Sequence, residues 1–173
     1  MVHSCKIKES SKFRGLYILE PTYFNDHRGS IYTTLDDSIS KKIIPNNYKF
    51  NHIKVAFRKK KVLAGIHGDR KSFKLITCVK GKITQYSVNN IAGDKNYLKY
   101  EKLILSEKNK KMVLIPPNYG NLFICEEDST IIYHYAYKGK YLDVNDQFTI
   151  KFYDPRIKLK LKIDNLIISD RDK

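Results

Sequence analysis

Short apolar runs separated by turn residues recur along the chain, and this spacing predicts strands rather than helices. Pro116 and Pro117 should end one run, because proline has no amide hydrogen to give to a strand ladder. Helical signals are few and short, confined to Asp37–Lys42 and the last residues. We expect about ten short strands, at Gly15–Glu20, Ile31–Leu35, Phe50–Phe57, Val62–Ile66, Phe73–Val79, Ile83–Val88, Leu98–Leu105, Met112–Ile115, Leu122–Cys125 and Thr130–Tyr137.

Turn residues and alternation also suggest how some strands pair. Lys80-Gly81-Lys82 has the character of a hairpin turn, which predicts that Ile83–Val88 pairs back on Phe73–Val79. Leu122–Cys125 and Thr130–Tyr137 are expected to pair in the same way. Ile157–Ile163 alternates strictly between apolar residues and lysine, as in a strand with one buried face.

These strands, with no linker or repeat between them, predict one all-β domain over residues 1–173, a double-sheet jelly roll with a few short helices. A chain of this length can bury a sizeable core. No apolar run is long enough to span a membrane, and Met1–Lys6 lacks the apolar core of a signal peptide. A cytoplasmic protein is therefore expected.

Net charge indicates the class of binding partner, and cysteine spacing bears on disulfides and zinc binding. The net charge of +15 favours an anionic partner, such as nucleic acid, a membrane surface or a phosphorylated small molecule. The basic clusters Arg58–Lys61 and Lys108–Lys111 resemble turns, and no nucleic-acid-binding signature is present, so neither nucleic acid nor membrane is expected. Cys5, Cys78 and Cys125 lack the spacing of a disulfide framework or a zinc site.

Several short motifs lie in the order of a known family. They are Asp26-His27-Arg28-Gly29, Val62-Leu63-Ala64-Gly65-Ile66-His67, Lys74-Leu75-Ile76, Leu105-Ser106-Glu107-Lys108-Asn109, Ile115-Pro116, Asp154-Pro155 and Ser169-Asp170-Arg171-Asp172. Together they resemble the dTDP-4-dehydrorhamnose 3,5-epimerase family, whose cupin-type enzymes epimerise 4-keto nucleotide sugars. The resemblance runs from about Glu20 to Asp172.

The resemblance implies a role for each matching residue. His67 stands at the catalytic base and Asp172 at the carboxylate that partners it. The catalytic tyrosine falls in Ile132–Tyr137, where Tyr133 is favoured and Tyr135 remains an alternative. The family also implies a homodimer, in which Arg28 reaches across the interface. The implied substrate contacts are Arg28, Lys74, Asn121, His52 and Phe24.

Departures from the family pattern fall at substrate contacts. Ala64 stands where the family has arginine and Asn121 where it has histidine. Thr33 replaces a frequent glutamate, and His52 a frequent glutamine. This predicts the family's chemistry on a different nucleotide sugar, such as a GDP-linked 4-keto heptose used in a bacterial surface or capsule polysaccharide.

The chemistry suits these residue types. A 4-keto group acidifies the hydrogens at C3 and C5, so a histidine base, a tyrosine acid and a cation near the ketone oxygen suffice. No metal or other cofactor is expected, because His67 has no second histidine two residues away. Epimerisation at C3 and C5 or at C3 alone, 3,4-ketoisomerisation, and non-catalytic binding of an anionic glycan or nucleotide all remain open.

Overall fold

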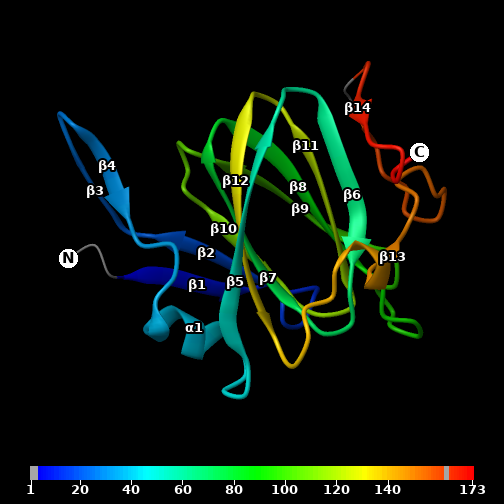
Figure 1. The fold of residues 1–173 in the computed structure, drawn as a ribbon, viewed down its shortest axis with the longest axis horizontal. Helices are drawn as coiled ribbons and strands as arrows, with labels where there is room; N and C mark the ends of the chain where they lie inside the picture. The colour runs from blue at the N-terminus through cyan, green and yellow to red at the C-terminus, as the bar shows by residue number, and fades with distance from the viewer. Residues whose placement is uncertain (1–3, 162–163) are drawn as a thin grey trace.

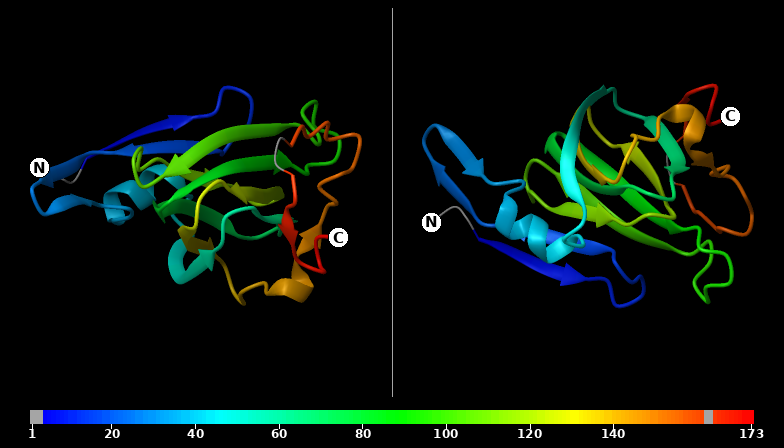
Figure 2. Two further views of the ribbon diagram at one scale, coloured as in Figure 1. Left: turned by 90° about the horizontal axis from the view of Figure 1, so that it is seen from above. Right: turned by 60° about the horizontal axis from the view of Figure 1, so that its bottom comes forward.

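The computed structural model describes residues 4–161 and 164–173, and two β-sheets stacked face to face form its body (Figures 1 and 2). One sheet has the order β1 (Cys5–Glu9), β2 (Tyr17–Pro21), β10 (Met112–Ile115), β7 (Phe73–Lys80), β12 (Ser129–Tyr137) and β5 (Lys49–Arg58). The other has the order β13 (Phe148–Thr149), β6 (Val62–Gly68), β11 (Tyr119–Cys125), β8 (Lys82–Asn89) and β9 (Tyr100–Ser106), with β14 (Ile167–Ile168) parallel to β6. The predicted all-β jelly roll is confirmed.

Three smaller elements complete the fold. The hairpin of β3 (Tyr23–Asp26) and β4 (Gly29–Tyr32) projects away from the two sheets (Figure 1). Helix α1 (Asp37–Ile43) confirms the helix expected at Asp37–Lys42, and the 3-10 turn η1 (Val144–Asp146) precedes β13. The Asp36 carboxylate starts α1 by accepting a hydrogen bond from the amide of Ile39 at 2.8 Å.

Both predicted strand pairings are wrong. β7 and β8 follow each other through Gly81, yet β7 pairs with β10 and β12, whereas β8 pairs with β9 and β11. β11 and β12 likewise lie in different sheets. A tight turn reverses the chain without fixing the sheet, and at Gly81 it carries the chain across the core. A Cβ at Gly81 would lie 2.3 Å from the Asp128 carbonyl oxygen, so the crossing needs glycine.

The chain ends also differ from expectation. Residues 157–161 keep the predicted alternation of burial but form no strand, and Lys162–Ile163 lie outside the described residues. The side chains of Ile157, Leu159 and Leu161 pack on the outer face of the second sheet instead. The last residues form β14 and a turn rather than a helix, and β1 and β3 were not predicted.

The core between the two sheets contains two of the three cysteines. Cys78 and Cys125 are buried in it, and burial raises the pKa of both thiols to about 11.

Within the described ranges 4–161 and 164–173, no helix is long and apolar enough to cross a membrane.

Candidate active site

A cavity of about 250 Å³ lies between the two sheets. Its walls come from β5, β6, β7, β11 and β12, and its lining includes His67, Lys74, Asn121 and Tyr133 among the residues predicted from the sequence. A larger hollow of about 740 Å³ beside α1 is lined by none of the predicted site residues. We therefore place the candidate active site in the smaller cavity. Its lining is Lys54, Val55, Ala56, Arg58, Ala64, His67, Lys74, Asn121, Phe123, Tyr133, Tyr135 and Gln147.

Gly65 allows β6 to lie close against β11. Its φ of +122° favours glycine, and a Cβ there would lie 2.2 Å from the Asn121 carbonyl oxygen. The register places Asn121 opposite His67. Since the side chain of Asn121 also accepts a 2.6 Å hydrogen bond from Gln85 Nε2, it is fixed at the cavity wall.

His67 and Asp172 form an ion-pair contact of 2.6 Å between Nε2 and Oδ1. The Asp172 side chain is 2% exposed, and its other oxygen accepts hydrogen bonds from Ser169 Oγ at 2.8 Å and the Gly65 amide at 3.4 Å. Strand β14, parallel to β6, brings the end of the chain to this point. The sequence motifs for these two residues therefore meet in space, although 104 residues separate them.

The pKa of His67 reflects opposing influences. Burial lowers it, Asp172 raises it, and the positive charges of Arg171 and Lys74 lower it, with a lowered pKa as the result. The neutral imidazole that a base requires is thus favoured at neutral pH.

Lys74 lies on the opposite sheet and pairs with Asp69 at 3.3 Å. Burial lowers the pKa of Lys74, while the Asp69 carboxylate opposes this shift. The other oxygen of Asp69 accepts hydrogen bonds from the amides of Lys71 at 2.9 Å and Ser72 at 2.6 Å. Asp69 was missed in the sequence, although a carboxylate in the short turn between two site strands was a usable signal.

Tyr133 and Tyr135 both line the cavity from β12. Their rings stack with centroids 6.1 Å apart, and burial raises the pKa of both hydroxyls. Tyr133 is hydrogen-bonded to the side chain of Asn121, whereas the ring of Tyr135 lies 5.9 Å from Lys74 Nζ. Both hydroxyls therefore stay protonated at neutral pH and can serve as acids.

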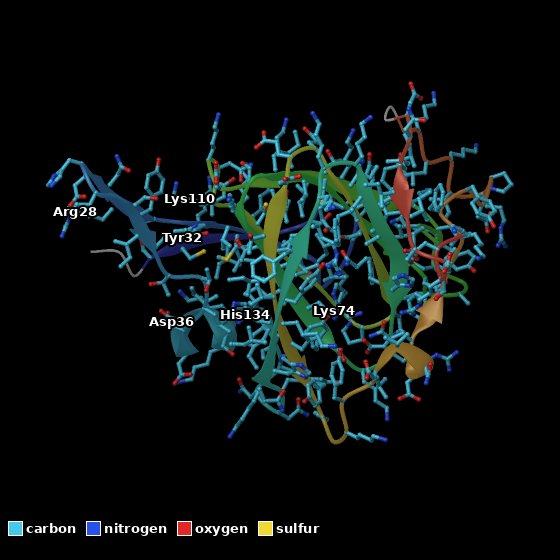
Figure 3. The ribbon with its side chains drawn as sticks, turned by 45° about the horizontal axis from the view of Figure 1, so that its top comes forward. Arg28, Tyr32, Asp36, Lys74, Lys110 and His134 are labelled. Carbon is cyan, nitrogen blue, oxygen red and sulfur yellow. The ribbon has the colours of Figure 1, made fainter. Side chains whose placement is uncertain are left out.

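The structure does not bring every predicted residue to the cavity. Arg28 lies at the tip of the β3–β4 hairpin, away from Lys74, and is paired with Asp26 at 2.6 Å (Figure 3). Phe24, on the same hairpin, is 50% exposed. His52 is not in the cavity lining but lies beside it, with its ring centroid 5.7 Å from that of Tyr135.

Two cations in the cavity lining were also missed. Lys54 and Arg58 alternate with outward-facing residues of β5, so both side chains lie on the cavity side. The period-two pattern of Phe50–Phe57 was the signal that could have found them. Among the described residues, no group of three histidine, cysteine or carboxylate side chains could hold a metal ion.

Known proteins of one family resemble this chain throughout. A model of the dTDP-4-dehydrorhamnose 3,5-epimerase family matches residues 10–173. The dTDP-4-dehydrorhamnose 3,5-epimerase of Escherichia coli (strain K12) is 26% identical over 167 residues, which cover 94% of this chain and 89% of that protein.

Solved structures show the same fold. The chain superposes with a TM-score of 0.87 and 20% identity on dTDP-6-deoxy-D-glucose-3,5-epimerase from Legionella pneumophila Philadelphia 1 in complex with dTDP-4-keto-L-rhamnose, covering 98% of this chain and 90% of that one. A 3′-monoepimerase from Streptomyces bikiniensis in complex with dTDP gives a TM-score of 0.86 at 19% identity, covering 95% and 84%.

Proposed function

Because the chain belongs to the dTDP-4-dehydrorhamnose 3,5-epimerase family, and is thus an isomerase that epimerises 4-keto nucleotide sugars, we propose that His67 is its catalytic base. The observation that carries this proposal is the 2.6 Å contact between His67 and the buried Asp172 at the wall of a cavity. A buried carboxylate on one ring nitrogen orients the imidazole and stabilises its protonated form after it has taken a proton.

Each residue of the cavity has a proposed role in the reaction. His67 removes the hydrogen from the carbon next to the ketone, and Lys74 stabilises the enolate oxygen with its positive charge. Asn121 offers a side-chain amide close to the same wall. Tyr133 returns a proton to the opposite face of the sugar, which inverts that carbon.

The substrate is proposed to differ from the family's usual one. Ala64 leaves no side-chain cation at its place in the cavity lining, while Lys54 and Arg58 supply two from β5. Both can bind a diphosphate, and the arginine fork can do so through two hydrogen bonds. This change of binding residues supports a different nucleotide sugar, of which a GDP-linked 4-keto heptose for a bacterial surface polysaccharide is our candidate.

A homodimer would bring the hairpin residues to an active site. Phe24 and Ile31 of the hairpin are 50% and 64% exposed, and Ile53 and Phe57 on the outer face of β5 are 63% and 76% exposed. Apolar surface of this kind favours a protein partner. We propose that a second copy covers it and that Arg28 and Phe24 then contact the nucleotide in the partner's cavity.

Isotope exchange tests the function directly. The protein is incubated in D2O, in separate reactions, with dTDP-4-keto-6-deoxy-D-glucose and with a GDP-linked 4-keto heptose. Each reaction is followed by mass spectrometry and proton NMR. Deuterium at C3 and C5 indicates a double epimerase, and deuterium at C3 alone a monoepimerase. A carbonyl that moves to C3 would indicate a 3,4-ketoisomerase instead. Absence of exchange with either sugar, or full exchange in His67→Asn, would refute the proposal.

A further inference from the structure

Thr149 lies against the ring nitrogen of His67 that Asp172 does not contact. Its Oγ1 is 3.2 Å from His67 Nδ1 and 3.2 Å from Arg171 Nε. The pairing of β13 with β6 places Thr149 directly opposite His67, and Thr149 is exposed to solvent. One hydroxyl therefore joins the imidazole, a guanidinium and the solvent.

The donors and acceptors fix the direction of these hydrogen bonds. Asp172 is an acceptor when ionised, so Nε2 of the neutral imidazole carries the hydrogen and Nδ1 is the basic nitrogen. Arg171 can only donate, so it occupies one lone pair of the Thr149 oxygen. That leaves the hydroxyl one hydrogen and one lone pair, and it can donate to neutral His67 or accept from protonated His67.

From this geometry we propose that Thr149 is a positioning residue that relays the proton between His67 Nδ1 and solvent. The proposal rests on His67 acting as the base. After His67 takes a hydrogen from the sugar, its Nδ1–H bond breaks as a bond forms to Thr149 Oγ1. The hydrogen that Thr149 already carried passes at the same time to a water molecule. The base is then neutral again, and the hydroxyl is restored.

The charges around His67 favour this release. Arg171 and Lys74 both lower the pKa of His67 electrostatically, and Asp172 opposes them. Arg171 is also hydrogen-bonded to the relay oxygen itself. Asp172 thus holds a proton on His67, whereas the two positive charges favour its loss, and Thr149 is the hydroxyl at Nδ1 that can pass it to water.

The fate of the abstracted hydrogen reports on this path. If release to water is fast, hydrogen taken from the sugar is replaced by solvent hydrogen. If release is slow, the same hydrogen returns to the carbon from which it came. Retention of a substrate label therefore measures the relay separately from the removal of the hydrogen. A purely structural role of Thr149 would not change this retention.

The experiment uses the full chain in H2O with dTDP-4-keto-6-deoxy-D-glucose deuterated at C3 and C5, or the equally deuterated GDP-linked 4-keto heptose if wild type accepts only that sugar. Mass spectrometry measures the deuterium kept in the recovered substrate, relative to the amount of epimer formed. Thr149→Val should raise retention about tenfold, the factor expected for loss of one hydrogen bond to the base. Thr149→Ser, which keeps the hydroxyl, should retain label as wild type does.

The outcomes separate the relay from the proposed function. If wild type exchanges neither sugar, the proposed function fails. If wild type exchanges but Thr149→Val keeps no more deuterium than wild type, or Thr149→Ser behaves like Thr149→Val, the relay is refuted. Thr149→Ala serves as a second variant should Thr149→Val unfold. A change of Arg171 to Met should move the acid limb of kcat/KM to higher pH, whereas Arg171→Lys, which keeps the charge, should move it less.

Discussion

Lys74 Nζ lies 3.3 Å from Asp69 Oδ2, and the two side chains are only 6% and 1% exposed. Burial of an ammonium group is costly unless a counter-charge and hydrogen bonds compensate for it. Asp69 supplies the counter-charge, and its second oxygen is held by two backbone amides of its own turn. Lys74 can therefore stay charged inside the cavity, where an enolate would need it.

Removing this counter-charge should destabilise the fold. Asp69→Asn leaves Lys74 buried without a carboxylate, so we expect the free energy of unfolding in urea to fall by roughly 3–5 kcal/mol. The pKa of Lys74 should fall further, because Asp69 raises it. The matched control is Asp26→Asn, which breaks the exposed pair with Arg28 and should lower the free energy of unfolding far less, because water screens that pair. Equal losses in the two variants would contradict this account.

The close approach of β6 and β11 predicts a second stability effect. Gly65→Ala would place a Cβ 2.2 Å from the Asn121 carbonyl oxygen at a positive φ. We expect a loss of about 3 kcal/mol or more, since backbone on both sides must move. Gly93→Ala is the control, because its φ is also positive but nothing lies within 4 Å of the added Cβ, and it should cost only about 1–2 kcal/mol. Circular dichroism melts of both variants test the difference.

The lowered pKa of His67 fixes the pH range of activity. The base works only when neutral, so kcat/KM should fall as pH drops through a pKa below 6.5, the ordinary value. Asp172→Asn removes a charge that raises this pKa, so the acid limb should move to still lower pH. The rate should also fall by about 10²–10⁴, because the imidazolium loses its partner. An acid limb that moved to higher pH in Asp172→Asn would contradict the assigned pairing.

Two tyrosines allow a matched test of the acid. If Tyr133 returns the proton, Tyr133→Phe should still exchange hydrogen at the carbon on the His67 side but should form epimer about 10²-fold or more slowly. Tyr135→Phe removes the neighbouring hydroxyl from the same strand and should affect the rate less. The ratio of deuterium exchange to epimer formation, measured by NMR, distinguishes them. The reverse ranking would assign the acid to Tyr135.

Mixing two inactive variants tests whether the hairpin acts across a dimer. If Arg28 serves the partner's cavity, a mixed dimer of His67→Asn and Arg28→Ala carries both changes in one active site. Its other active site has an intact His67 and an intact Arg28. Random reassociation should therefore restore about a quarter of wild-type activity. No recovery after mixing, with dimers present by light scattering, would mean that Arg28 does not act across the interface.

The sequence alone determined the fold class and named five of the twelve residues that line the cavity, His67, Lys74, Asn121, Tyr133 and Tyr135. Short apolar runs between turn residues gave nearly all the long strands, because a strand that packs on a core needs apolar side chains. The motif ending in His67 named the base candidate through its resemblance to the family, since all of its residues lie together on one strand.

Only the tertiary structure decided which strands share a sheet and which side chains meet. The turn at Gly81 looked like a hairpin but crosses between sheets, because a turn fixes direction and not hydrogen-bonding partners. The contact of His67 with Thr149 joins residues far apart in the chain, so no local pattern contains it, and the contact with Asp172 was expected only from the family resemblance. The pairing of Lys74 with Asp69 depends on burial, which appears only once the two sheets have closed around it.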